Sequence, residues 1–267
     1  MDISLGFSPC PNDTFIFNAL VNGPLPPIGY RLQVALHDVE TLNRMAFEER
    51  LDVTKLSYYA WLKVREHYRL LSSGGALGYG CGPLVIAARP LTRDDMAECR
   101  VVLPGEWTTA HLLFRLWAPH VQQRRFIAYD QIFEALAAGE ADCGVIIHES
   151  RFTFASAGLQ AVVDLGAWWE GETGMPIPLG CIAAHRRLPI DLIDRIEEDI
   201  RQSILVGRKD PGAALAYIRS HAQEMTADVL QQHIDTFVNA FSLDLGYKGR
   251  QAIRMLENRA RKAGVLT

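Results

Sequence analysis

The sequence predicts an α/β protein with two lobes joined by a hinge. Over the first two thirds of the chain, short β-like runs alternate with helical patterns, which is typical of parallel strands joined by helical crossovers. From Ile190 onward the pattern is purely helical, and amphipathic helices need an existing surface on which to bury their apolar faces. Two strand-like segments, residues 84–88 and 179–184, are placed where the chain would cross between lobes, so we expect a hinge there and a ligand site in the cleft.

The elements can be predicted in order along the chain. Strands are expected at residues 3–7, 31–36, 53–56, 84–88, 100–103, 126–129, 143–147 and 161–165. Helices are expected at residues 14–21, 40–49, 109–117 and 131–138, with Asn12 or Asp13 as the N-cap of the first. In the helical tail, Ile193, Ile196, Ile200 and Ile204 share one apolar face. We therefore assign residues 1–88 and 181–267 to a larger discontinuous lobe and residues 89–180 to a smaller inserted lobe.

Composition and spacing exclude several classes of protein. The 267 residues are 49% hydrophobic and 22% charged, with a net charge of −4, and the basic clusters are short, so we expect no nucleic-acid partner. No apolar run approaches the roughly 20 residues that span a bilayer, and the start of the chain lacks a signal-peptide pattern. Five scattered cysteines without a C-x-x-C pair indicate reduced thiols, and no metal-ligand spacing occurs. We expect a cytoplasmic protein with no membrane contact and no metal.

Two segments of the larger lobe could bind an anion. Residues 8–13 (SPCPND) follow the first predicted strand and open a helix, where backbone N–H groups favour anions, and Asn12 and Asp13 would shape the site. Lys55, Leu56 and Ser57 end another strand, and a lysine charge beside a serine hydroxyl could hold a carboxylate. The alternatives are a well-capped turn for the first segment and a solvated lysine for the second.

The smaller lobe offers two matching segments. Thr108 and Thr109 stand at a strand-to-helix junction, where a threonine N-cap directs hydroxyl and N–H groups towards a ligand. His148 follows the apolar run 143–147, and histidine is the commonest general acid or base near neutral pH. Glu149 and Ser150 could orient it. A plain threonine cap and a structural histidine remain the alternatives.

Beyond these segments, runs spread along the whole chain resemble one enzyme family. They are residues 6–15 (GFSPCPNDTF), 38–43 (DVETLN), 54–58 (TKLSY), 73–78 (SGGALG), 146–153 (IIHESRFT), 164–169 (DLGAWW) and 239–244 (NAFSLD). In collinear order they are similar to 1,4-dihydroxy-6-naphthoate synthases, enzymes of the futalosine route to menaquinone. The match covers nearly the whole chain and is therefore far more specific than any single segment.

The resemblance implies a fold, a reaction and site residues. The fold would be that of type II periplasmic-binding-protein-like proteins. The reaction would be carbon–carbon cleavage of cyclic dehypoxanthine futalosine, a small-molecule carboxylate, to 1,4-dihydroxy-6-naphthoate, without a cofactor. The family's proton acceptor corresponds to His148, and its substrate-contacting segments correspond to Lys55–Ser57 and Thr108–Thr109.

Two other functions remain open on the residues alone. The same fold serves non-catalytic solute-binding proteins that bind small anions. A chorismate dehydratase-like enzyme of the same pathway is the nearer enzymatic alternative, although the run 146–150 (IIHES) favours the synthase. The sequence does not fix an oligomeric state, and a homodimer is compatible with it.

Overall fold

Two compact units make up the chain. The computed structural model describes residues 1–148, 150–221 and 226–266. The first unit comprises Met1–Gly78 and Leu179–Arg250, and the second comprises Tyr79–Pro178 and Gln251–Thr267. The boundaries differ from the expected ones in three respects. Residues 79–88 belong to the second unit, because their strand is an interior strand of that unit's sheet; the chain returns to the first unit at residue 179 instead of 181; and the end of the chain belongs to the second unit.

The first unit is built on a mixed sheet of order β2-β1-β3-β11-β4, with β5 paired to β11. Its strands are β1 (Asp2–Phe7), β2 (Arg31–Leu36), β3 (Val53–Ser57), β4 (Tyr68–Leu70), β5 (Ala76–Gly78) and β11 (Ile177–His185). Its helices are α1 (Pro11–Val21), α2 (Val39–Phe47), α3 (Tyr58–Val64), α8 (Ile190–Lys209), α9 (Pro211–His221), α10 (Ala227–Phe237), α11 (Ala240–Leu243) and the start of α12 (Gly246–Lys262). β1 is parallel to β2 and β3, whereas β11 is antiparallel to β3 and β4.

The second unit has a sheet of order β10-β6-β9-β7-β8. Its strands are β6 (Leu84–Ala87), β7 (Val101–Leu103), β8 (Arg124–Phe126), β9 (Cys143–Ile146) and β10 (Gln160–Asp164). Its α-helices are α4 (Thr109–Trp117), α5 (Ile132–Ala137), α6 (Ser150–Thr153) and α7 (Leu165–Thr173), with 3-10 turns at Asp94–Glu98, Tyr129–Gln131 and Phe154–Ala157. β7 is parallel to both β8 and β9, while β6 runs antiparallel to β9 and β10.

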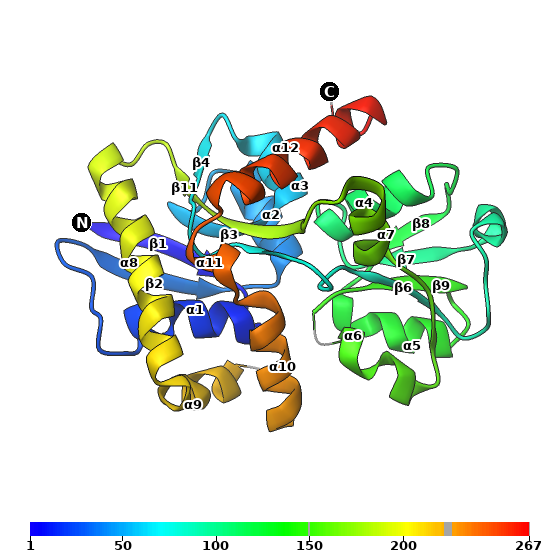
Figure 1. The fold of residues 1–267 in the computed structure, drawn as a ribbon, viewed down its shortest axis with the longest axis horizontal. Helices are drawn as coiled ribbons and strands as arrows, with labels where there is room; N and C mark the ends of the chain where they lie inside the picture. Colours follow the sequence, from blue (N-terminus) through cyan, green and yellow to red (C-terminus); the bar gives the residue numbers. More distant parts are fainter. Residues whose placement is uncertain (149, 222–225, 267) are drawn as a thin grey trace. The chain divides into compact units, whose positions relative to one another are not determined.

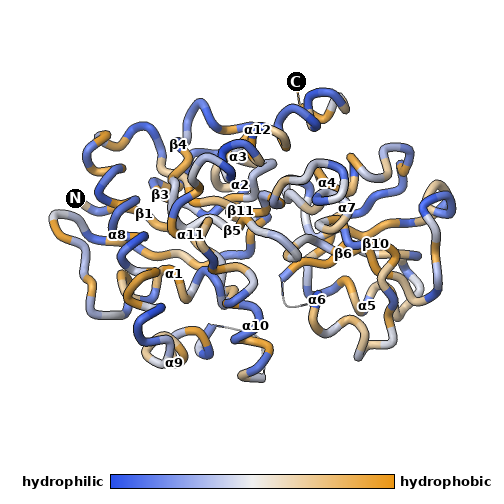
Figure 2. The backbone as a smooth tube through the Cα atoms, in the orientation of Figure 1, coloured by the Kyte–Doolittle hydropathy of each residue, from blue (hydrophilic) through white to orange (hydrophobic). Residues whose placement is uncertain are grey.

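The C-terminal helices complete the core of the first unit, as the helical pattern predicts. The stripe of Ile193, Ile196, Ile200 and Ile204 on α8 is buried, and α8 lies beside α1 (Figure 1). Figure 2 shows hydrophobic residues along the central strands of each unit and alternating hydrophilic and hydrophobic turns along α8. All five cysteines are buried thiols. Within the part of the chain that the structure describes, no helix has the length and apolar character needed to cross a membrane.

Candidate functional site

The carboxyl edge of the first unit's sheet collects the residues that were predicted to bind an anion. β1 pairs in parallel with β3, with Leu5 opposite Val53 and Gly6 opposite Thr54. The loop after β1 and the end of β3 therefore lie at the same edge, which is where ligands bind in open α/β sheets. Register thus brings together Asp13 and Lys55, which are 42 residues apart in sequence.

Lys55 and Asp13 form a buried ion pair at this edge. Lys55 is 5% exposed and Asp13 is fully buried, and the ammonium donates to Oδ1 of the carboxylate. The same Oδ1 accepts from Asn12 Nδ2 at 2.7 Å, while Oδ2 accepts from the Oγ and the N–H of Ser8 at 2.7 and 3.2 Å. A solvated lysine, the alternative left open by the sequence, is therefore wrong.

The predicted N-cap of α1 is also wrong. The helix begins at Pro11, and Cys10 is its N-cap, with no side-chain capping bond. Proline is favoured at the first helical position because its fixed φ suits the helix and its missing N–H would have no intrahelical acceptor there. Asn12 and Asp13 consequently lie inside the first turn, and their side chains are engaged in the buried network instead of capping the helix.

Ser57 is held by an asparagine that the residue spacing does not single out. Asn43 is fully buried on α2; its Oδ1 accepts from the Ser57 N–H at 2.9 Å, and its Nδ2 donates to Ser57 Oγ at 3.2 Å. The Ser57 hydroxyl keeps its own hydrogen as a donor. The side chain of Leu56, which lies between Lys55 and Ser57 in sequence, is fully buried.

Gly180 makes room for the Lys55 side chain. It lies on β11 opposite Ser57, and a Cβ at this position would be 2.9 Å from Lys55 Cε and 3.2 Å from the carbonyl oxygen of Leu56. The absence of a side chain at residue 180 thus lets the lysine stem pass over β11. Only the pairing register exposes this requirement, so spacing along the chain could not have found it.

The second unit presents Thr108 and Thr109 at the carboxyl end of β7. Thr108 is the N-cap of α4, as predicted: its Oγ1 accepts from the His111 N–H at 3.2 Å and donates to the Gly105 carbonyl at 3.0 Å. Both threonines are 2% exposed. His111, one turn into the helix, was not predicted; burial lowers its pKa to about 4, so its ring is neutral at pH 7.

His148 has an unusual backbone at the carboxyl end of β9. Its φ is 57°, and among the described residues it shares a positive φ with one other non-glycine residue, Glu49. Such conformations cost about 1–3 kcal/mol and gather at functional sites. The half-buried ring meets Tyr129 edge-on, with centroids 5.3 Å apart and planes at 69°. Glu149, a candidate for orienting it, lies outside the described residues.

Arg151 anchors the chain just after His148. Its guanidinium donates to the Gly82 carbonyl and to Asp164 Oδ2 at 3.4 Å, and its side chain is 14% exposed. Asp164 in turn caps α7 by accepting from the N–H groups of Gly166 and Ala167 at 2.8 and 3.0 Å. The helix after His148 is thereby tied to the strand ends of β6 and β10.

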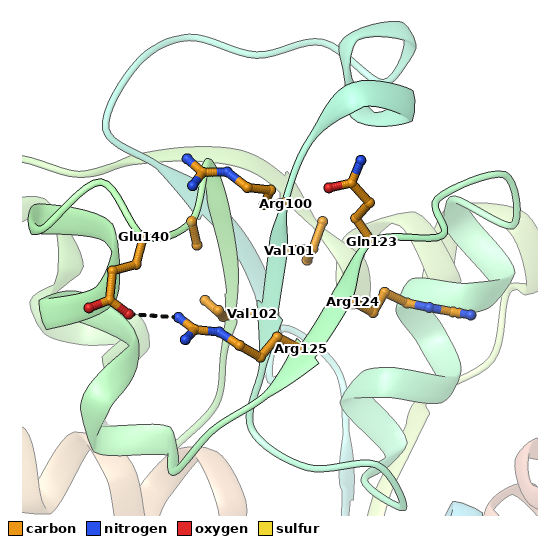
Figure 3. Close-up of a pocket in the computed structure, with 8 residues that line it drawn as sticks. Arg100, Val101, Val102, Gln123, Arg124, Arg125 and Glu140 are labelled. Atoms are coloured by element: carbon orange, nitrogen blue, oxygen red, sulfur yellow. Dashed lines mark hydrogen bonds and ion pairs between the residues drawn. The ribbon is translucent and has the colours of Figure 1, made fainter.

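A separate pocket of about 340 Å³ lies at the opposite edge of the same sheet (Figure 3). It is lined by Arg100, Val101, Val102, Gln123, Arg124, Arg125, Glu140 and Ala141, which precede or begin β7, β8 and β9. Its charges are largely matched, because Arg125 pairs with Glu140 at 2.9 Å and Arg100 with Asp142 at 3.1 Å. The predicted site residues of this unit, Thr108, Thr109 and His148, are not among the residues that line this pocket.

The chain is similar along its whole length to proteins of known activity. A family model described as menaquinone biosynthesis matches residues 3–262. A 1,4-dihydroxy-6-naphthoate synthase of Thermus thermophilus is 49% identical over 267 residues, covering 98% of this chain and 95% of the relative. This chain belongs to the 1,4-dihydroxy-6-naphthoate synthase family of menaquinone biosynthesis. A synthase of Streptomyces coelicolor is 42% identical and covers 99% and 94% of the two chains. The predicted family and the prediction of an enzyme are confirmed.

Solved structures confirm the predicted fold class. A protein from Archaeoglobus fulgidus superposes with a TM-score of 0.94 at 29% identity, over 99% of this chain and 98% of the other. The alkanesulfonate-binding protein SsuA of Xanthomonas axonopodis, bound to MOPS, has a TM-score of 0.76 at 12% identity, over 100% and 94%. This chain therefore shares the periplasmic-binding-protein-like fold with such binding proteins, and at this level of identity the likeness extends to the fold alone.

Proposed function

We propose that this chain is a carbon–carbon lyase that converts cyclic dehypoxanthine futalosine to 1,4-dihydroxy-6-naphthoate, with His148 as the general base. The observation that carries the proposal is a histidine with a positive φ, two residues after a buried strand that runs parallel to β7 and ends at the carboxyl edge of its sheet. Removal of a substrate proton by the imidazole starts the cleavage of a carbon–carbon bond. The cleavage is favourable because it forms the aromatic naphthoate, and the sugar-derived fragment leaves.

The other predicted site residues have distinct roles in this proposal. Lys55 has three N–H donors and gives one to Asp13, so two remain for a substrate carboxylate. The Ser57 hydroxyl is a further donor for the substrate. Because the Leu56 side chain is fully buried, only the backbone of Leu56 could contact the substrate. Thr108 and Thr109 supply the first-turn groups of α4, which favour substrate oxygens. Asn12 and Asp13 shape the site without having to touch substrate.

The test is turnover of cyclic dehypoxanthine futalosine by purified wild-type, His148→Ala and His148→Gln proteins, with the naphthoate product followed by chromatography. His120→Ala is the matched control, since it removes an exposed histidine of the same unit. We expect wild type and control to be equally active and both His148 variants to lose about 10²–10⁴-fold in kcat, the usual contribution of a positioned base. Equal rates in all four proteins would remove His148 from the mechanism, and no product from folded wild type would contradict the reaction.

A further inference from the structure

A histidine on α10 contacts the hydrogen-bond network around the buried ion pair. His233 is fully buried, and its Nε2 lies 3.0 Å from Oδ1 of Asn12, 221 residues away. Its ring also packs on Phe237, with centroids 4.7 Å apart. His233 thus contacts the network that surrounds Asp13.

The network fixes which atoms donate. The Nδ2 of Asn12 donates to Asp13 Oδ1, so the amide must present its oxygen to His233. An amide oxygen only accepts, and the imidazole nitrogen facing it must therefore carry a hydrogen. The structure thus requires Nε2 of His233 to be protonated, whatever the state of its other nitrogen.

The chain of bonds ends at the lysine ammonium. The Asp13 carboxylate is fixed on one oxygen by Ser8, and its other oxygen is shared by Asn12 and Lys55. If Asn12 were free to rotate, Oδ1 would lose one of its two donors, and the position of the ammonium would depend on the ion pair alone. Buried polar networks of this kind fix geometry only when every member is bonded.

We infer that His233 is a positioning residue: through Asn12 and Asp13 it sets the place of the Lys55 ammonium that holds the substrate carboxylate. This inference rests on the proposed function of Lys55 as a carboxylate-binding group. It assigns to His233 an effect on substrate and product affinity and no direct part in proton transfer.

The kinetic test compares His233→Leu, which removes the donor, with His233→Gln, which can donate to Asn12 from its amide. His185→Gln is the matched control, because His185 is another buried histidine of the first unit, and it bonds Glu49 at 2.8 Å, outside this network. We expect His233→Leu to raise KM for cyclic dehypoxanthine futalosine and Kd for 1,4-dihydroxy-6-naphthoate by about 3- to 10-fold, the worth of one hydrogen bond. Its kcat should stay within about twofold, and His233→Gln should restore both constants.

Equal KM in all variants, or equal losses in His233→Leu and His233→Gln, would overturn the inference. A second measurement needs no variant kinetics. In ¹⁵N-histidine-labelled wild type, with the His233 signal assigned by its loss in His233→Gln, we expect Nε2 to be protonated; an unprotonated Nε2 would overturn it. Because this readout and the product Kd do not depend on turnover, failure of the proposed reaction can be told apart from failure of the positioning role.

Discussion

The buried network of Lys55 and the single histidine His148, at the carboxyl edges of the two sheets, are held in opposite ways. In the first unit, Asp13, Lys55 and Ser57 are at most 5% exposed, and each is fixed by side-chain hydrogen bonds. In the second unit, His148 is half-buried, lies on a backbone with positive φ and meets the edge of an aromatic ring. The first arrangement suits a rigid donor set for an anion, and the second suits a single group that exchanges a proton.

Buried ionisable groups show the same contrast. The first unit pairs Lys55 with Asp13 and surrounds the carboxylate with further donors. The second unit buries His111, and burial lowers the pKa of its ring to about 4. Removing one partner of a buried ion pair destabilises the fold because it leaves an unpaired buried charge. A buried neutral histidine lowers the stability only when acid protonates it.

Breaking the Lys55–Asp13 pair should have the largest effect on stability. Asp13→Asn leaves the ammonium buried without its counter-charge, and we expect the free energy of unfolding to fall by about 3–5 kcal/mol in urea denaturation. Adding Lys55→Met to this variant should recover part of the loss, since the buried charge is then gone. Arg125→Met, which breaks an exposed pair with Glu140, should cost less than about 1 kcal/mol. Additive losses in the double variant would contradict a coupled pair.

Local signals in the sequence predict the scaffold but not the network. The strand at residues 31–36, the helix at residues 109–117 and the Thr108 cap agree with the structure, because strand alternation and threonine capping are local. The predicted strand at residues 126–129 is displaced, since β8 is Arg124–Phe126 and a 3-10 turn follows. A three-residue edge strand is too short to show a clear alternation of apolar and polar residues.

The hydrogen bonds that the predicted site residues make could not be predicted from the sequence. Asp13 meets Lys55 across 42 residues, and Asn12 meets His233 across 221. Such pairs depend on strand register and on the docking of α10 against α1, neither of which leaves a periodic pattern. The positive φ of His148 is equally invisible in its side-chain type, because histidine is compatible with several backbone conformations.

Acid should destabilise the second unit through His111. Its folded pKa, about 4, is below the ordinary 6.5, so the unfolded chain binds more protons between these values. The contribution to stability is complete above pH 6.5 and is lost as the pH falls towards 4, by up to about 3 kcal/mol. We expect His111→Gln to flatten this part of the profile of unfolding free energy against pH. The same slope in wild type and variant would contradict a buried neutral ring.

Removing the anchor after His148 should affect activity as well as stability. Arg151→Met removes donors to the Gly82 carbonyl and to Asp164, and hydrogen bonds of charged groups are worth about 1.5–3 kcal/mol. Displacement of the histidine should lower kcat by up to about 100-fold. Arg151→Lys keeps the charge but not the planar fork, so its kcat should fall between wild type and Arg151→Met. An unchanged kcat in Arg151→Met would mean that His148 keeps its place without this anchor.

The smallest effect is expected from adding a methyl group at Gly180, beside the Lys55 side chain in the first unit. Gly180→Ala places a Cβ 2.9 Å from Lys55 Cε, and the buried, ion-paired lysine can move only by straining its bond to Asp13. We expect a loss of about 1–2 kcal/mol in unfolding free energy, together with a higher KM. Gly171→Ala is the control: apart from the local backbone of α7, no atom of the described residues lies within 4 Å of its Cβ position, and alanine favours helix by about 0.5–1 kcal/mol. If Gly180→Ala were as harmless as Gly171→Ala in both stability and KM, the lysine would not be held as tightly as its buried contacts require.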